Sequence, residues 1–197
     1  MDSIHEEARE VPAASGGPGH GLSGPPGPPR PESREEIARR NPGGPGDRWV
    51  DEAEFLARPL AGLGQGVEVG PSDRKVYLPA IGIGPAGTAV DRVGYAEALP
   101  FVDGSLDYVV ANHVLEHCAD PVRVLREWRR AVRPGGIIGF NVPDCDHQDT
   151  FRLNPEHRHI TTRLICEEWI RLAGGLEIVE EGAPVPGWSL GFICRAV

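Results

Sequence analysis

The chain has 197 residues, of which 40% are hydrophobic, and its formal net charge is −9 at pH 7. This length suffices for one α/β domain with its own core and an additional tail. The acidic balance makes the phosphate backbone of a nucleic acid an unfavourable partner.

The cysteines and the apolar runs indicate a compartment. Four cysteines are widely spaced and form no CxxC pair, and no apolar run approaches the length that spans a membrane. No basic segment followed by an apolar one marks a secretory signal near residue 1. We therefore expect a cytoplasmic protein with reduced thiols and without a membrane partner.

Residues 1–46 are rich in glycine and proline, as in the run Pro25–Pro29, and contain few apolar side chains. Such a segment cannot offset the entropy cost of ordering, so we predict a disordered tail over 1–46 and a folded domain over 47–197. Within the tail, Ser33–Arg40 has the spacing of a capping box and predicts a transient helix. A non-essential extension is favoured over a flexible tether to a partner.

The first part of the domain predicts alternating helix and strand. Apolar residues at helical spacing predict a helix over Asp47–Ala61, and Gly66–Pro71 predicts a short strand that runs into a tight turn. Prolines and glycines interrupt Arg74–Gly87, which predicts a short helix and an irregular apolar loop. Thr88–Asp91 is interpreted as the end of the second strand.

A strand, a helix and a strand follow within a short distance. Leu106–Ala111 is an apolar run rich in β-branched residues, and Asp120-Pro121 supplies an N-cap and a proline at the first helical position. The helix is predicted to stop at Arg133–Gly136, and Ile137–Val142 then begins a buried strand. This order predicts a right-handed parallel βαβ unit.

The last third predicts a helix and two strands. Thr161 or Thr162 caps the helix, which Gly174-Gly175 ends. Leu176–Glu180 alternates as a half-buried strand does, and Ser189–Arg195 is the last strand. The predicted fold is therefore α/β, with a doubly wound, mostly parallel sheet and a C-terminal antiparallel hairpin.

Several words in fixed order resemble one family. Leu99–His117 reads LPFVDGSLDYVVANHVLEH, and it is followed by Asp120-Pro121, LREWRR and RPGG. This series resembles the class I S-adenosylmethionine-dependent methyltransferases of type 11. The resemblance implies a Rossmann-like fold, S-adenosyl-L-methionine as cofactor and a small-molecule methyl acceptor. It also implies that a terminal hairpin closes the sheet.

The resemblance also assigns cofactor-binding residues. Glu68 and Gly70 match the first motif, in which an acidic residue is followed by glycines, whereas Ser72 and Arg74 occupy later glycine positions. Asp91 follows Glu68 by 23 residues and is assigned to the ribose hydroxyls. The remaining assignments are Tyr95, Ala96 and Glu97 beside the adenine, and Asn112 and His113 beside the methionine part.

The segment after Asp91 departs from the family. Seven residues separate Asp91 from Leu99, where the family usually inserts a helix and a strand. Tyr95 stands where the family has an aspartate that binds the adenine amino group, and a tyrosine is not an ionised acceptor at neutral pH. Either the domain is shortened after the second strand, or adenine recognition is altered or lost.

Histidines supply the candidate catalytic bases. His113, His147 and His159 could each remove a proton from an acceptor hydroxyl or amine, although solvated loop histidines are the more common alternative. His113 and His117 have the i, i+4 spacing of zinc ligands on a helix. Because no third and fourth ligand can be assigned, we predict no metal.

The sequence is consistent with two functions. The first is a methyltransferase that transfers the methyl group of S-adenosylmethionine to a small molecule, mainly by positioning the acceptor in line with the methyl. The second is a catalytically inactive methyltransferase-like accessory or binding protein, because the glycine turn is incomplete. A nicotinamide-dependent Rossmann enzyme fits poorly, since the turn lacks G-x-G-x-x-G.

Overall fold

A seven-stranded sheet in the order β3-β2-β1-β4-β5-β7-β6 organises the molecule. The computed structural model describes residues 32–40 and 47–197. Strands β1 to β5 run parallel, and β7 is antiparallel to both β5 and β6. The strands are β1 (Gly66–Val69), β2 (Ile81–Gly84), β3 (Arg92–Val93), β4 (Leu106–Asn112), β5 (Val132–Pro143), β6 (Leu176–Val185) and β7 (Ser189–Ala196). The predicted doubly wound fold with its C-terminal antiparallel hairpin is confirmed.

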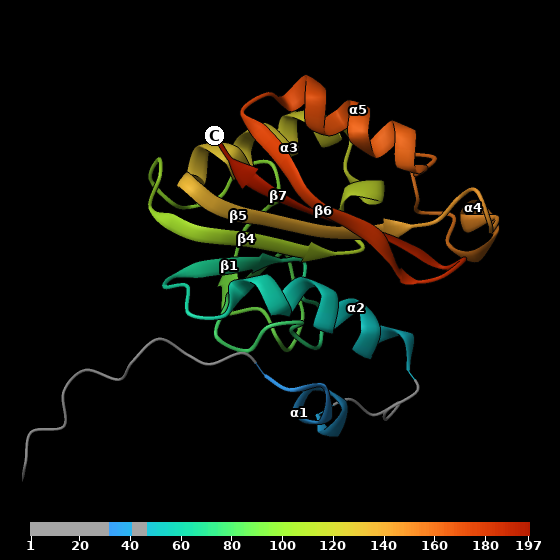
Figure 1. The fold of residues 1–197 in the computed structure, drawn as a ribbon, viewed down its shortest axis with the longest axis horizontal. Helices are drawn as coiled ribbons and strands as arrows, with labels where there is room; N and C mark the ends of the chain where they lie inside the picture. The colour runs from blue at the N-terminus through green and yellow to red at the C-terminus, as the bar shows by residue number, and fades with distance from the viewer. Residues whose placement is uncertain (1–31, 41–46) are drawn as a thin grey trace, which may run out of the picture.

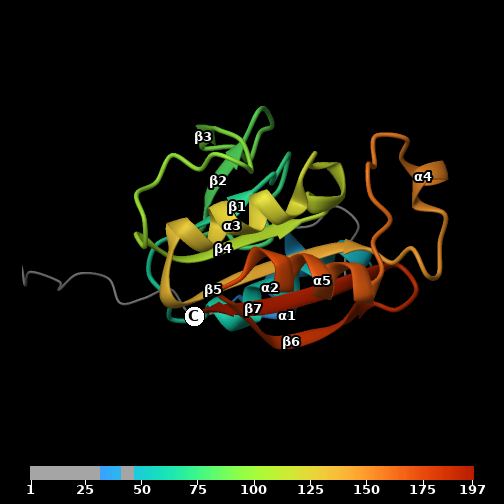
Figure 2. The same cartoon turned by 90° about the horizontal axis from the view of Figure 1, so that it is seen from above.

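Helices cover both faces of this sheet (Figures 1 and 2). The described helices are α1 (Arg34–Arg39), α2 (Arg48–Ala57), α3 (Pro121–Ala131), α4 (Thr150–Leu153) and α5 (Arg163–Ala173), with short 3-10 turns η1 (Arg58–Leu60) and η2 (Leu115–His117). One core lies between the sheet and α3 and α5, with Trp128 and Phe140 fully buried. The other lies between the sheet and α2, around Leu56 and Tyr108. Among the described helices, none combines the length and the apolar character that a membrane crossing requires.

Local signals account for the helices that the sequence predicted. The Asp120 carboxylate accepts from the Arg123 amide at the start of α3, and the Thr162 hydroxyl accepts from the Ile165 amide at the start of α5. Gly174 ends α5 with a φ of 75°. Each cap satisfies a helix-end group that has no partner within the helix, so the boundary follows from neighbouring residues.

The second strand differs from the prediction. It is Ile81–Gly84, within a stretch predicted as a loop, and the predicted end at Asp91 is wrong. Ile83 is fully buried, and the Asp91 amide donates to the Gly82 carbonyl. A Cβ on Gly82 would lie 2.2 Å from the Ala89 carbonyl oxygen, so the glycine lets the following loop lie directly against the strand. Neither the β1–β2 nor the β2–β3 connection contains a helix, which makes this half of the domain the shortened one.

The N-terminal segment is only partly described. The sequence predicts disorder over 1–46, but residues 1–31 and 41–46 lie outside the described residues. Ser33 forms the predicted capping box with Glu36, and α1 buries Ile37 and Ala38 in the same core as α2. A domain boundary at residue 47 therefore leaves out a helix that packs on the domain.

Candidate functional site

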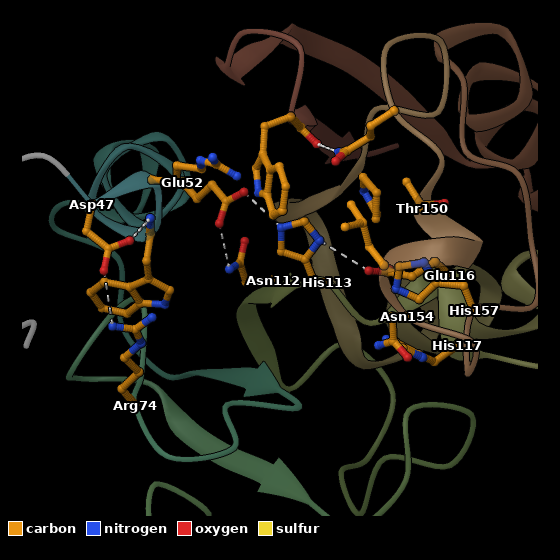
Figure 3. A pocket seen from close by; sticks show the side chains of 16 residues that line it. Asp47, Glu52, Arg74, Asn112, His113, Glu116, His117, Thr150, Asn154 and His157 are labelled. Atoms are coloured by element: carbon orange, nitrogen blue, oxygen red, sulfur yellow. Dashed lines mark hydrogen bonds and ion pairs between the residues drawn. The ribbon is translucent and has the colours of Figure 1, made fainter. Parts of the chain in front are cut away.

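Two adjoining pockets open beside the carboxyl ends of β1 and β4, the edge at which open parallel sheets bind ligands. The larger pocket has a volume of about 450 Å³ and the smaller about 240 Å³. Trp49, Arg74 and Asn112 line both of them. Figure 3 shows the larger pocket, with Asp47 and Arg74 at one end and His117 and His157 at the other.

The smaller pocket gathers three of the predicted cofactor residues, Glu68, Gly70 and Ser72. Gly70 has a φ of 68°, and a Cβ there would lie 2.7 Å from the side chain of Val114, so only glycine fits this turn. Asp73 also lines the pocket, although sequence reasoning missed it. It is exposed, and its carboxylate accepts from the Thr88 hydroxyl at 3.4 Å.

Glu68 reaches away from solvent toward the segment that follows the turn. Its carboxyl group is buried and accepts from the amides of Val76 at 2.9 Å and Tyr77 at 3.3 Å. Burial raises the pKa of Glu68 to about 8, against the two amides, which favour the ionised form. Glu68 therefore ties β1 to the irregular connection that leads to β2.

Asp91 does not lie at the carboxyl edge. It precedes β3 and sits beside Gly82 in the first half of β2, so it faces the opposite end of these parallel strands. Its carboxylate pairs with Lys75 and accepts from the Gly82 amide at 2.7 Å. The resemblance predicts that the second strand ends in a ribose-binding acid, but β2 ends at Gly84. This position does not favour the ribose role predicted for Asp91.

Tyr95, Ala96 and Glu97 follow β3 and line neither pocket. Tyr95 is 60% exposed, and Glu97 is exposed as well. Ala96 is buried, and its carbonyl accepts from the indole nitrogen of Trp128 at 3.0 Å. The segment is thus anchored on α3 through Ala96, while its neighbours face solvent.

Asn112 is the last residue of β4 and lines both pockets, and His113 follows it and lines the larger one. The Asn112 amide donates to Glu52 at 3.3 Å, and the His113 backbone has a φ of 54°. Nε2 of His113 lies 2.8 Å from Glu52, and Nδ1 lies 3.2 Å from Glu116 (Figure 3). Burial opposes its charged form, but the two carboxylates outweigh it and raise the pKa of His113 to about 10. His113 is therefore an imidazolium at neutral pH.

The other predicted bases lie outside the pocket lining. Nδ1 of His147 lies 2.7 Å from the buried carboxylate of Asp144, and the His147 side chain is 64% exposed. Nε2 of His159 donates to the Cys118 carbonyl at 2.8 Å, and its ring packs edge-on against Trp169. The structure brings only His113 of the three into the pocket.

Sequence reasoning missed Glu52 and Trp188 in the wall of the larger pocket. Glu52 comes from α2, and Trp188 comes from the turn between β6 and β7. The Arg48 guanidinium lies 4.0 Å from the ring centroid of Trp188. His117 and His157 meet from segments 40 residues apart, with ring centroids separated by 4.7 Å. Histidine-bearing segments were visible in the sequence, but no local pattern indicates that they meet.

Part of this sequence is similar to known proteins. Residues 80–140 match the family model described as a methyltransferase domain. An uncharacterized methyltransferase of a Mycobacterium species is 38% identical over 98 residues, which is 48% of this chain and 34% of that protein. The chain spans 26% to 45% of the length of the first curated relatives that it matches.

Solved structures share the fold at low identity. A Thermotoga maritima protein, described as an S-adenosylmethionine-dependent methyltransferase and possible histamine N-methyltransferase, has a TM-score of 0.62 and 20% identity. That match covers 76% of this chain and 89% of the other. The cyclase SpnF has a TM-score of 0.60 and 18% identity, over 87% of this chain and 99% of SpnF. The chain is therefore similar to methyltransferases in sequence over residues 80–140, and it shares the fold of S-adenosylmethionine-dependent methyltransferases.

Proposed function

We propose that the chain transfers the methyl group of S-adenosylmethionine to a small-molecule acceptor. The observation that carries this proposal is the junction of the two pockets at Trp49, Arg74 and Asn112. A donor in the smaller pocket would meet an acceptor in the larger one, and methyl transfer needs chiefly such positioning. A volume of about 450 Å³ is in the range of small-molecule sites.

The donor set of the smaller pocket fits the cofactor. Gly70 lines this pocket at the turn, and Ser72 and Asp73 add polar groups beside it. We assign the ribose hydroxyls to Asp73 rather than to Asp91, because Asp73 alone of the two lines the pocket. Asn112 stays a predicted contact of the methionine part. S-adenosylmethionine would supply an electrophilic methyl group on sulfur.

His113 acquires a different role from the predicted one. Its two ring nitrogens are held by Glu52 and Glu116, so it carries its protons at neutral pH and is not a base. We propose that His113 is a positioning residue, because it holds Glu52 of α2 and Glu116 of η2 in place around the larger pocket. His147, oriented by Asp144, stays a candidate base outside the pocket lining.

A calorimetric titration with S-adenosylmethionine tests the proposal. We expect saturable binding, and Asp73→Asn should weaken it by about 1–3 kcal/mol through lost hydrogen bonds to the ribose. Asp91→Asn is the matched control, since it removes the same charge on the opposite edge, and it should leave the affinity within about twofold. Absence of binding at millimolar ligand contradicts the function; equal losses in both variants contradict only the assignment of Asp73.

A methyltransferase-like protein without catalysis is the second candidate. It rests on Ser72 and Arg74 at glycine positions of the first motif and on the helix-free connections on both sides of β2. The same titration separates the two candidates, since an accessory protein of this kind would bind no cofactor.

A further inference from the structure

Three metal-ligating side chains converge at one end of the larger pocket. Glu116 and His117 belong to η2, and His157 comes from the loop after α4. One ligand atom from each of the three lies within 4.8 Å of the others. Figure 3 shows the three together, on the far side of His113 from Glu52. We refer to Glu116, His117 and His157 as the triad.

Two atoms of the triad are buried without a hydrogen-bond partner among the described residues. They are Oε2 of Glu116 and Nδ1 of His157. The Glu116 side chain is fully buried, and its other oxygen is already used by His113 at 3.2 Å. Leaving such groups unsatisfied costs about 1–3 kcal/mol each, so a buried pair of them indicates a missing partner.

The third member is oriented as a ligand. Nδ1 of His117 lies 3.3 Å from the backbone carbonyl of Glu156, where it can only donate, so the lone pair of the neutral ring is on Nε2. Histidines that bind metals usually hold their other nitrogen against a carbonyl or carboxylate in this way. The lone pair on Nε2 of His117 is thereby available to coordinate a metal ion.

We propose that the triad binds a divalent transition-metal ion of the zinc type, with two imidazoles and one carboxylate as protein ligands. This donor set is typical of zinc sites that keep a coordination position open. Bonds of about 2.0–2.1 Å would bring the ligand atoms, which lie within 4.8 Å of one another, to about 3.4 Å apart, and this requires only small movements of the three side chains. The sequence-based expectation of no metal considered His113 and His117, but His113 is committed to Glu52 and Glu116.

The open position gives the site a use. Because all three ligands line the larger pocket, an oxygen of a bound acceptor could occupy the remaining position. A metal-bound hydroxyl loses its proton more readily than a free one, so the ion could lower the pKa of an acceptor hydroxyl. This use rests on the proposed function, whereas metal binding itself does not.

Metal titration of the untagged full chain, after dialysis against a chelator, tests the site without cofactor or acceptor. We expect one tightly bound Zn²⁺ ion per chain and, with Co²⁺, a visible absorption spectrum of nitrogen and oxygen ligation. His157→Gln and His117→Gln should each weaken Zn²⁺ binding on the order of 100-fold and abolish the cobalt bands. Zn²⁺ should also raise the unfolding temperature of the wild type and not of these variants.

His147→Gln is the matched control, because it removes an exposed histidine outside the triad and should retain Zn²⁺ binding. Glu116→Gln should also lose Zn²⁺ binding, but this substitution disturbs a buried pair with His113. If the Glu116→Gln protein does not fold, the two histidine variants alone test the proposal. No binding by the wild type, or unchanged binding in His117→Gln and His157→Gln, overturns the proposal. Failure of methyl transfer would leave this result unaffected.

Discussion

Glu68 shows how a single residue couples the first strand to a connection without a helix. Its carboxyl group is fully enclosed, and its main partners are the amides of Val76 and Tyr77. The free energy of desolvation outweighs these hydrogen bonds, which is why the pKa is raised to about 8. Glu68, which the motif assigns to cofactor binding, thus also joins β1 to the connection that leads to β2.

Substituting Glu68 by glutamine should change how stability depends on pH. The raised pKa means that the folded state binds a proton more tightly than the unfolded state, whose value is near 4.5. The stabilising contribution is complete below about pH 4.5 and is lost as pH rises to about 8. Relative to Glu68→Gln, the wild type should therefore lose up to about 1.4 kcal/mol per pH unit across this window.

Urea denaturation of both proteins at a series of pH values measures this difference. Glu97→Gln serves as a control, because it removes an exposed carboxylate and leaves Glu68 in place. Parallel pH profiles for the wild type and Glu68→Gln would show that Glu68 does not titrate in this window.

At the scale of elements, α1 holds the same connection from outside. Arg40, which caps its end, donates to the backbone carbonyls of Lys75 and Val76 and pairs with Glu32. Its guanidinium also lies 5.2 Å from the Trp49 ring centroid. The short helix therefore fixes the segment whose amides bind Glu68.

Removing this link should destabilise the fold. We expect Arg40→Ala to lower the free energy of unfolding by about 1–3 kcal/mol, because two carbonyls lose a charged donor. Arg39→Ala is the matched control, since Arg39 is exposed and donates to the Glu35 carbonyl within its own helix. The midpoint of urea unfolding measures both, and equal shifts would show that α1 does not support the connection.

The elements also show which features of a sequence can be predicted. The helices α3 and α5 were found because their caps, Asp120 and Thr162, act on residues three positions away. Strand β2 was missed because Gly82 and Gly84 look like loop residues until the backbone of Ala89 is placed against the strand. The pocket shows the same limit: Asn112 and His113 follow from a strand end, whereas His157 enters through contacts distant in the sequence.

For the whole molecule, the two halves of the sheet differ in their support. Strands β4, β5 and β7 are central, paired on both sides, and covered by α2 on one face and by α3 and α5 on the other (Figure 1). Strands β2 and β3 are joined by connections without helices, and β3 is a two-residue edge strand with both residues exposed. Local opening requires least free energy where few buried apolar contacts are broken.

Hydrogen exchange should therefore divide the sheet. Amides of 106–112 and 137–142 should exchange far more slowly than those of 81–98, because the former open only with the core. Adding S-adenosylmethionine should slow exchange mainly over 70–76, the wall of the smaller pocket, while Zn²⁺ should slow it over 113–118 and 154–158. Exchange measured by mass spectrometry resolves these peptides. Uniform protection across the sheet would contradict the division, and protection by S-adenosylmethionine confined to α5 would place the cofactor elsewhere.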